Sequence, residues 1–277
     1  MGEAIIQFYK QKVKNMHLQW FPGHMTKALR MMEQEVSLCD GIVFVLDARA
    51  PFACFNKKLT TIFNNKPVVY VLNKCDLVEG SDVKYFENEL KAQGKNVVSV
   101  IGTSEKCATR LYDAIENSLK SIKERHLKKG VNKPLRVMVA GIPNTGKSTI
   151  INALCGGKKA VTGNKAGVTK GKQWVRLREL ELLDTPGILW PKFDDQKVGL
   201  HIAMIGSINE DILDQNELAI KLLDYIMANY KGYVQARYNV EEEGTGEEML
   251  KKIEFSNKDK LIIAGDYIDR SEWASAK

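Results

Sequence analysis

The stretch LRVMVAGIPNTGKS, residues 135–148, decides the fold. Its first six residues are apolar enough to predict a buried strand, and its last eight fit the pattern G-x-x-x-x-G-K-S. In that pattern the glycines let backbone N–H groups turn inward around phosphate groups. A helix is expected to follow directly and to stop at Gly156-Gly157, with its positive dipole end facing the same phosphates. Strand, loop and helix together predict a P-loop NTPase.

The P-loop also indicates how phosphates and a metal ion would be held. We expect Lys147 to reach the β and γ oxygens and to act in catalysis, and we expect the Ser148 hydroxyl to bind Mg²⁺. The neighbouring residues of the loop and the helix complete the predicted phosphate site: Asn144, Thr145, Gly146 and Thr149.

Apolar segments elsewhere predict a mainly parallel α/β sheet. They indicate buried strands at 41–46, 67–72, 97–101 and 135–140, a helix at 104–124, and a hairpin around Val175 and Leu182. Buried strands that alternate with helices form parallel sheets with right-handed crossovers. Four residues fall directly after predicted strands, and we expect them to converge at the ligand-binding edge of the sheet: Asp47, Asn73, Gly141 and Asp184.

A base-recognition motif follows the second predicted strand, because Asn73-Lys74-Cys75-Asp76 fits N-K-x-D. The Asp76 carboxylate can accept from the two guanine donors, N1–H and the exocyclic amine, a pair that adenine lacks. Asn73 can bond another edge of the base, and the stem of Lys74 can cover the ring. Ile101 and Gly102 lie where a loop behind the base is expected, although the match there is poor. In a chain with a P-loop, this motif favours GTP or GDP over adenine nucleotides.

A third motif, D-x-x-G, is present at Asp184-Thr-Pro-Gly187. We expect Asp184 to hold Mg²⁺ and the Gly187 N–H to contact the γ-phosphate. We interpret Gly167-Val-Thr169 as a switch, with Thr169 as a second hydroxyl ligand to Mg²⁺. An ordinary loop threonine is the alternative.

The order of these motifs is unusual. N-K-x-D precedes both the P-loop and D-x-x-G, whereas N-K-x-D comes last in most GTPases. With WFPGHM at 20–25 and DARAP at 47–51, the set resembles the circularly permuted GTPases of the ribosome biogenesis GTPase A family (the YlqF/RbgA type). The resemblance implies an assembly factor for the large ribosomal subunit. Its partner would be a subunit precursor, with rRNA and ribosomal proteins, that stimulates turnover.

The residue after D-x-x-G leaves the mechanism of hydrolysis open. Many GTPases place a water-orienting glutamine there, and this chain has Ile188. The family's W-F-P-G-H-M histidine is proposed to act in hydrolysis, which carries over to His24; a packing role for His24 is the alternative. Asn144 resembles the asparagine of potassium-activated GTPases, so K⁺ is a second hypothesis. A GTP-switched RNA- or protein-binding module with negligible hydrolysis is the alternative function.

Composition excludes several classes of protein. The 277 residues are 44% hydrophobic and 27% charged, which is typical of a globular and not a disordered chain. The apolar runs are too short to span a membrane and no signal-peptide pattern is present, so we expect a cytoplasmic monomer without membrane contact. Five cysteines without a C-x-x-C pair argue against a disulfide scaffold or a structural zinc site.

The net charge of +7 hides two regions of opposite charge. Residues 1–206 carry 32 Lys and Arg against 19 Asp and Glu, a net charge of +13, whereas 207–277 carry 9 against 15, a net charge of −6. We expect a permuted GTPase domain with an N-terminal extension at 1–206. A small all-helical domain is expected at 207–277, starting at the capping-box pattern of Ser207 to Glu210. Because D-x-x-G leads straight into that domain, we expect nucleotide state to be transmitted along 187–210.

The stretch 119–172 is the most basic part of the chain, with 13 Lys and Arg and one acid. It includes a predicted linker at 124–134, which would join the termini of an unpermuted GTPase. Part of its charge would serve the nucleotide, and the rest predicts an RNA-binding face: Lys120, Lys123, Arg125, Lys128, Lys129, Lys158 and Lys159.

Overall fold

The computed structural model describes residues 23–55, 57–63, 65–157, 160, 173–189, 193 and 195–263. The chain divides into two compact units, Met1–Ile208 and Asn209–Lys277. The sequence placed the boundary after Gly206, two residues earlier.

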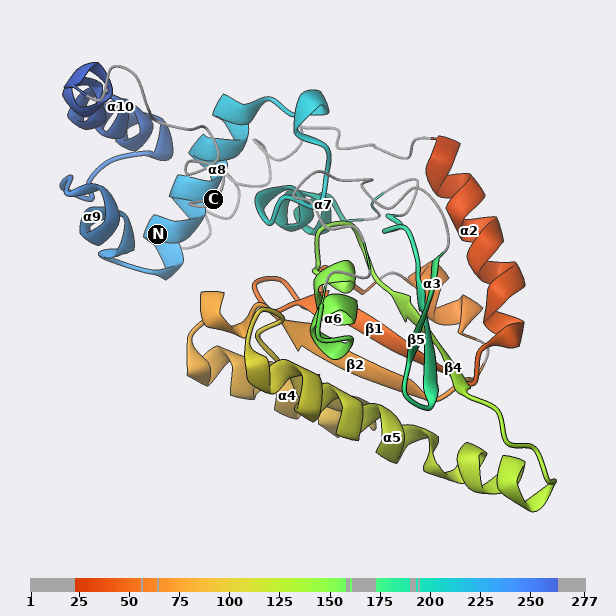
Figure 1. The fold of residues 1–277 in the computed structure, drawn as a ribbon. Helices are drawn as coiled ribbons and strands as arrows, with labels where there is room; N and C mark the ends of the chain where they lie inside the picture. Colours follow the sequence, from red (N-terminus) through yellow and green to blue (C-terminus); the bar gives the residue numbers. More distant parts are fainter. Residues whose placement is uncertain are drawn as a thin grey trace. The chain divides into compact units, whose positions relative to one another are not determined.

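The first unit is built on a six-stranded sheet with the order β3-β2-β1-β4-β6-β5 (Figure 1). The strands are β1 (Gly41–Asp47), β2 (Val68–Asn73), β3 (Asn96–Ser99), β4 (Leu135–Ala140), β5 (Gln173–Leu177) and β6 (Leu180–Asp184). Neighbouring strands are parallel except for the β5–β6 hairpin. The predicted mainly parallel sheet is therefore confirmed.

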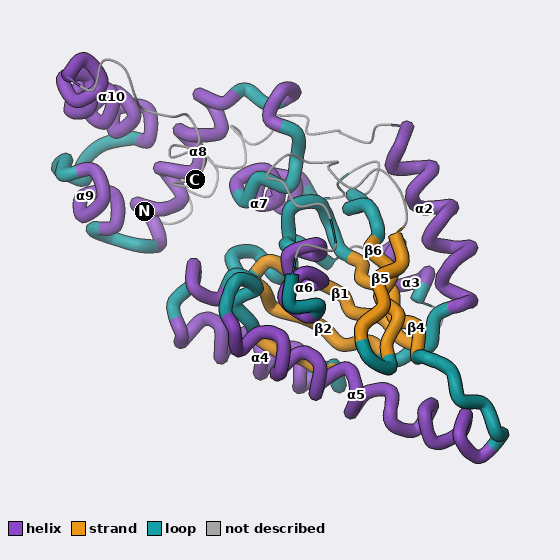
Figure 2. The backbone as a smooth tube through the Cα atoms, viewed as in Figure 1, coloured by secondary structure: helices purple, strands orange, loops and turns teal. Residues whose placement is uncertain are grey.

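Helices cover both faces of this sheet, so the strands form the middle layer of the first unit (Figure 2). The helices are α2 (Gly23–Glu35), α3 (Lys57–Ile62), α4 (Gly80–Ala92), α5 (Glu105–Lys128), α6 (Lys147–Leu154) and α7 (Gln196–Met204). Successive side chains of a strand point to opposite faces. Val43 and Val45 of β1 accordingly join the core beneath α5 and α6. Phe44 packs edge-to-face against Phe63, with ring centroids 5.2 Å apart.

Helix α5 is longer than predicted and replaces part of the expected linker. It begins after Ser104, whose side chain accepts from the Lys106 N–H, and it continues to Lys128, four residues past the predicted end. Its last turn is exposed and basic, which favours a helix C-terminus because cations there oppose the helix dipole. Gly130, with φ +71°, follows its end. The true connection to β4 is therefore the short segment 129–134.

The second unit is helical in its described residues. It contains a 3-10 turn at Glu210–Ile212 and helices α8 (Gln215–Asn229), α9 (Tyr233–Tyr238) and α10 (Gly246–Ile263). Its core is formed by Leu223, Val234, Met249 and Ile253. No described helix combines the length and the apolar character needed to cross a lipid bilayer.

The predicted capping box at Ser207 is wrong. The Ser207 hydroxyl is buried and donates to the Pro143 carbonyl, 2.7 Å away. Helix α8 instead begins after Asp214, whose carboxylate accepts from the Glu217 N–H at 3.0 Å. The serine that the local pattern assigned to a helix cap therefore forms its hydrogen bond with a residue distant in sequence.

Candidate nucleotide-binding site

The phosphate loop joins β4 to α6 and requires glycine at both of its ends. Gly141 has φ +152° and Gly146 has φ +92°. A Cβ on Gly141 would lie 2.5 Å from the Val45 carbonyl oxygen, and one on Gly146 would collide with the Asn73 amide. Close packing against β1 and the N-K-x-D loop therefore explains both glycines of the motif.

Lys147 is folded into this loop. Its side chain is 6% exposed and its ammonium donates to the Ile142 carbonyl at 2.8 Å. Burial lowers the pKa of Lys147 to about 8, although the nearby charge of Asp184 acts to raise it. An anionic ligand would stabilise such a buried cation.

Ser148 and Asp184 meet at the start of α6. The Ser148 hydroxyl donates to Asp184 Oδ2 at 2.9 Å. The other carboxylate oxygen, Oδ1, is buried and makes no hydrogen bond within the described part of the chain. Burial raises the pKa of Asp184, against the lowering effects of Ser148 and Lys147. A hydroxyl beside an unsatisfied carboxylate oxygen fits the oxygen-donor chemistry of Mg²⁺.

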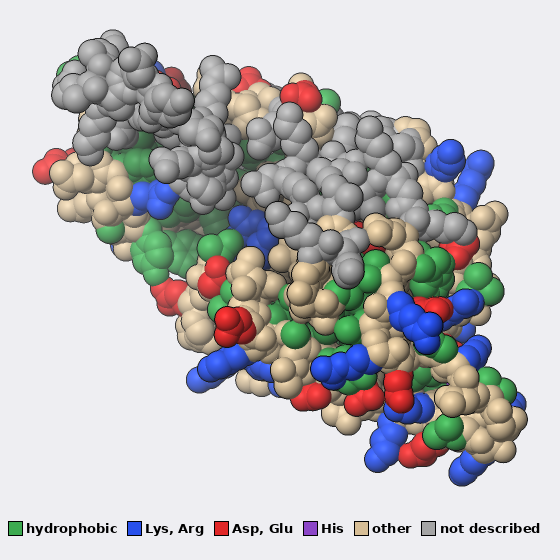
Figure 3. Space-filling model, in the orientation of Figure 1, with side chains coloured by type: hydrophobic (Ala, Val, Ile, Leu, Met, Phe, Trp, Pro, Cys, Tyr) green, Lys and Arg blue, Asp and Glu red, His purple; other side chains and the backbone are tan. Residues whose placement is uncertain are grey.

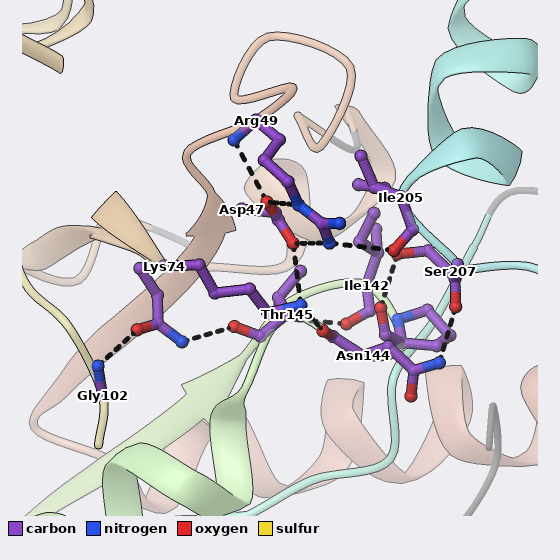
Figure 4. Close-up of polar contacts among 12 residues, drawn as sticks. Asp47, Arg49, Lys74, Gly102, Ile142, Asn144, Thr145, Ile205 and Ser207 are labelled. Carbon is purple, nitrogen blue, oxygen red and sulfur yellow. Dashed lines mark hydrogen bonds and ion pairs between the residues drawn. The ribbon is translucent and has the colours of Figure 1, made fainter. Parts of the chain in front are cut away.

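Asn73 ties the N-K-x-D motif to two other loops. Its amide donates to the Thr145 carbonyl at 2.8 Å, and its oxygen accepts from the Gly102 N–H at 2.9 Å (Figure 4). A Cβ on Gly102 would lie 2.9 Å from that oxygen. The 101–102 segment, whose sequence matched poorly, therefore meets the N-K-x-D motif through its backbone.

The next three residues of the motif differ in their surroundings. Lys74 has φ +63° and donates to the Asn144 carbonyl at 2.7 Å. The Cys75 thiol donates to the Leu72 carbonyl at 3.2 Å. Asp76 is exposed in the 3-10 turn Cys75–Leu77, and Ile101 is 37% exposed. Hydrogen bonds from Lys74 and Cys75 thus fix the conformation of the loop, while the Asp76 carboxylate is accessible to a ligand.

The D-x-x-G segment packs on the phosphate loop. A Cβ on Gly187 would lie 2.5 Å from the Pro143 N and Cα atoms. The Ile188 N–H donates to the Gly141 carbonyl at 3.3 Å, and the Ile188 side chain is 1% exposed. Ile188 therefore packs in the core, at the position where many GTPases place a water-orienting glutamine.

Comparison with known proteins identifies the family. A family model described as "50S ribosome-binding GTPase" matches residues 136–264. A second, described as "Ethanolamine utilisation - propanediol utilisation", matches residues 21–117. A relative from Priestia megaterium named ribosome biogenesis GTPase A is 39% identical, over 82% of this chain and 80% of that protein. One of the same name from Bacillus cereus is 35% identical, over 92% of this chain and 86% of that protein.

The chain belongs to the ribosome biogenesis GTPase A family. The crystal structure of GNP-bound YlqF from T. maritima is similar, with 26% identity, a TM-score of 0.50, and coverage of 84% of this chain and 92% of that one. Family membership confirms the predicted resemblance and the prediction of a GTPase. The permuted order is also confirmed, because β2 with N-K-x-D precedes β4 with the P-loop in sequence while both are neighbours of β1 in the sheet.

For two predicted site residues of this GTPase, the structure describes no side chain. Thr169 lies outside the described residues, and His24 is described only in its backbone, as the second residue of α2. Thr149 is partly buried in the first turn of α6.

Sequence reasoning missed two polar side chains of the site. Arg49 forms a bidentate pair with Asp47, and Ser207 binds the phosphate loop at Pro143. The DARAP stretch was the available signal for Arg49, but nothing local signals the partner of Ser207.

Proposed function

We propose that this chain is a GTP-binding and GTP-hydrolysing assembly factor for the large ribosomal subunit, with hydrolysis stimulated by the ribosome. The main support is the Asn73 amide, which joins the N-K-x-D motif, the phosphate loop and the 101–102 segment. Relatives are named for ribosome biogenesis, and the matching family model is described as ribosome-binding. The natural partner is therefore a subunit precursor containing rRNA and ribosomal proteins.

The proposed nucleotide contacts follow the site as described. Asp76 accepts from the guanine donors, and Lys147 with the loop N–H groups binds the phosphates. Ser148 and Asp184, with Thr169, would hold Mg²⁺, which neutralises phosphate charge when bound. Gly187 would contact the γ-phosphate.

K⁺ is a second proposed cofactor, at Asn144. This residue has a left-handed backbone, φ +59°, and its amide donates to the Gly206 carbonyl at 2.6 Å. A cation bound near Asn144 would therefore act where the phosphate loop meets the end of the first unit. Hydrolysis rates in KCl and in NaCl should differ if the proposal holds.

His24 is our candidate for orienting the attacking water. The buried Ile188 side chain leaves that role to another residue. Without assistance, turnover should be on the order of 10⁻⁴ to 10⁻² s⁻¹, as in unassisted GTPases. His24→Ala should abolish ribosome-stimulated turnover and retain GTP affinity; unchanged turnover would leave His24 with a packing role.

The proposed RNA-binding face lies on the distal half of α5, where Figure 3 shows Lys and Arg side chains among acidic ones. Lys120, Arg125, Lys128 and Lys129 are exposed. Lys123 is ion-paired with Glu116 and Glu179, so it contributes less than we expected. Lys158 and Lys159 lie outside the described residues. Phosphate binding by such cations makes affinity fall with salt.

The decisive experiment measures GTP hydrolysis with and without large ribosomal subunits, at two salt concentrations. We expect stimulation that weakens at the higher salt concentration. Lys128→Glu with Lys129→Glu should reduce it, whereas the control Lys251→Glu with Lys252→Glu, in the acidic second unit, should not. Binding without stimulation would favour the alternative, a GTP-switched binding module with negligible hydrolysis.

Cytoplasmic location and a monomeric state remain predictions.

A further inference from the structure

Asp47, the last residue of β1, is a buried charge at the centre of the site. Its side chain has no exposed surface. Burial acts to raise the pKa of Asp47, but hydrogen bonds from Arg49 and the charge of Lys74 outweigh it, so its pKa lies below the usual range. A carboxylate that stays ionised when buried depends on the cations that surround it.

Two cations satisfy both oxygens of this carboxylate. Arg49 donates from Nε to Oδ1 at 2.9 Å and from Nη2 to Oδ2 at 2.7 Å. Lys74 forms an ion pair with Oδ2 at 2.9 Å. The arginine fork fixes the plane of the carboxylate, and the plane in turn sets where the lysine ammonium can lie.

Each cation also reaches a backbone carbonyl in a distant part of the chain. Lys74 donates to the Asn144 carbonyl of the phosphate loop at 2.7 Å. Arg49 donates to the Ile205 carbonyl at 3.0 Å, across 156 residues of sequence. One carboxylate thus holds together the N-K-x-D loop, the phosphate loop and the segment that leaves the first unit (Figure 4).

We propose that Asp47, with Arg49, is a positioning residue for guanine nucleotides: it fixes Lys74 against the phosphate loop without touching the ligand. This inference rests on the proposed binding of guanine at the N-K-x-D motif. If Asp47 loses its charge, Lys74 keeps only a neutral carbonyl partner in a partly buried place, and its ammonium turns toward water. The stem that covers the base and the contact between the two loops are then lost together.

The test is nucleotide affinity in Asp47→Asn, which keeps the side-chain shape and removes the charge. The dissociation constant of fluorescent GDP should rise about tenfold to a hundredfold, as for the loss of charged hydrogen bonds. The KM for GTP should rise with kcat unchanged, because uniform binding is lost. Partial unfolding would instead lower kcat and leave KM unchanged. Asp40→Asn is the matched control, since Asp40 accepts a backbone N–H near the opposite end of β1 and should leave affinity unchanged.

Arg49→Lys gives a second measurement if Asp47→Asn does not fold. It keeps a positive charge but loses the fork, so GDP affinity should fall by a smaller factor. A GDP dissociation constant equal to the wild-type value in a folded variant of either kind overturns the proposal. If the wild-type chain itself does not bind GDP, the proposed function fails instead.

Discussion

At the scale of single residues, the choice of base depends on one accessible carboxylate. Asp76 is exposed beside the tightly held Lys74. Asp76→Asn replaces one carboxylate oxygen with an NH₂ donor, which opposes one of the two guanine donors and suits the C2 carbonyl of xanthine. GTP affinity should fall about a hundredfold and XTP affinity should rise. Competition against fluorescent GDP measures both.

Asp113→Asn, on the exposed face of α5, is the control and should change neither affinity. Equal weakening of GTP and XTP by Asp76→Asn would contradict base recognition by Asp76. The spacing within each motif is local in sequence, so the sequence alone could assign such residues to the loops that follow β2, β4 and β6. Arg49 was missed although its carboxylate partner, Asp47, lies two residues away in the DARAP stretch. Its second partner, the Ile205 carbonyl, lies 156 residues away, and no local pattern encodes that contact.

At the scale of elements, the loops after β4 and β6 pack closely against each other at Gly187. Gly187→Ala would push a methyl group into the Pro143 backbone, 2.5 Å from its N and Cα atoms. Backbone atoms cannot move aside cheaply, so the phosphate loop must shift, and overpacking of this kind costs about 1–3 kcal/mol. We expect a lower melting temperature and weaker binding of a GTP analogue. Both are measured by thermal denaturation with and without nucleotide.

Gly157→Ala is the matched control, because a Cβ there meets nothing within 4 Å. If both variants had the same melting temperature and the same affinity for the GTP analogue, the contact between Gly187 and Pro143 would contribute to neither. Apolar runs predicted the bounds of the central strands β1 and β4 to within one residue, because these strands are buried along nearly their whole length. Helix ends were predicted less well. Helix α5 runs past Glu124 through Arg125, Leu127 and Lys128, which are good helix formers. Ser207 has a tertiary partner instead of a cap role.

At the scale of the whole molecule, three consecutive residues connect the site to the chain that leads into the second unit. The Ile205 carbonyl accepts from Arg49, the Gly206 carbonyl accepts from Asn144, and the Ser207 hydroxyl donates to Pro143. The sequence predicted transmission of nucleotide state along 187–210 from connectivity alone. The contacts that could carry this transmission join residues distant in sequence, so only the folded structure shows them.

Ser207→Ala tests this connection. It removes the 2.7 Å bond from a buried hydroxyl to the phosphate loop and leaves every proposed nucleotide ligand in place. GDP affinity should change little, whereas the preference of the ribosomal subunit for the GTP-analogue form over the GDP form should shrink. Co-sedimentation in each nucleotide state measures that ratio, and Ser37→Ala, which removes an exposed hydroxyl bonded to the Gln34 carbonyl, is the control. A wild-type ratio in Ser207→Ala would mean that Ser207 does not transmit nucleotide state, because a ligand shifts an equilibrium only through contacts that differ between its states.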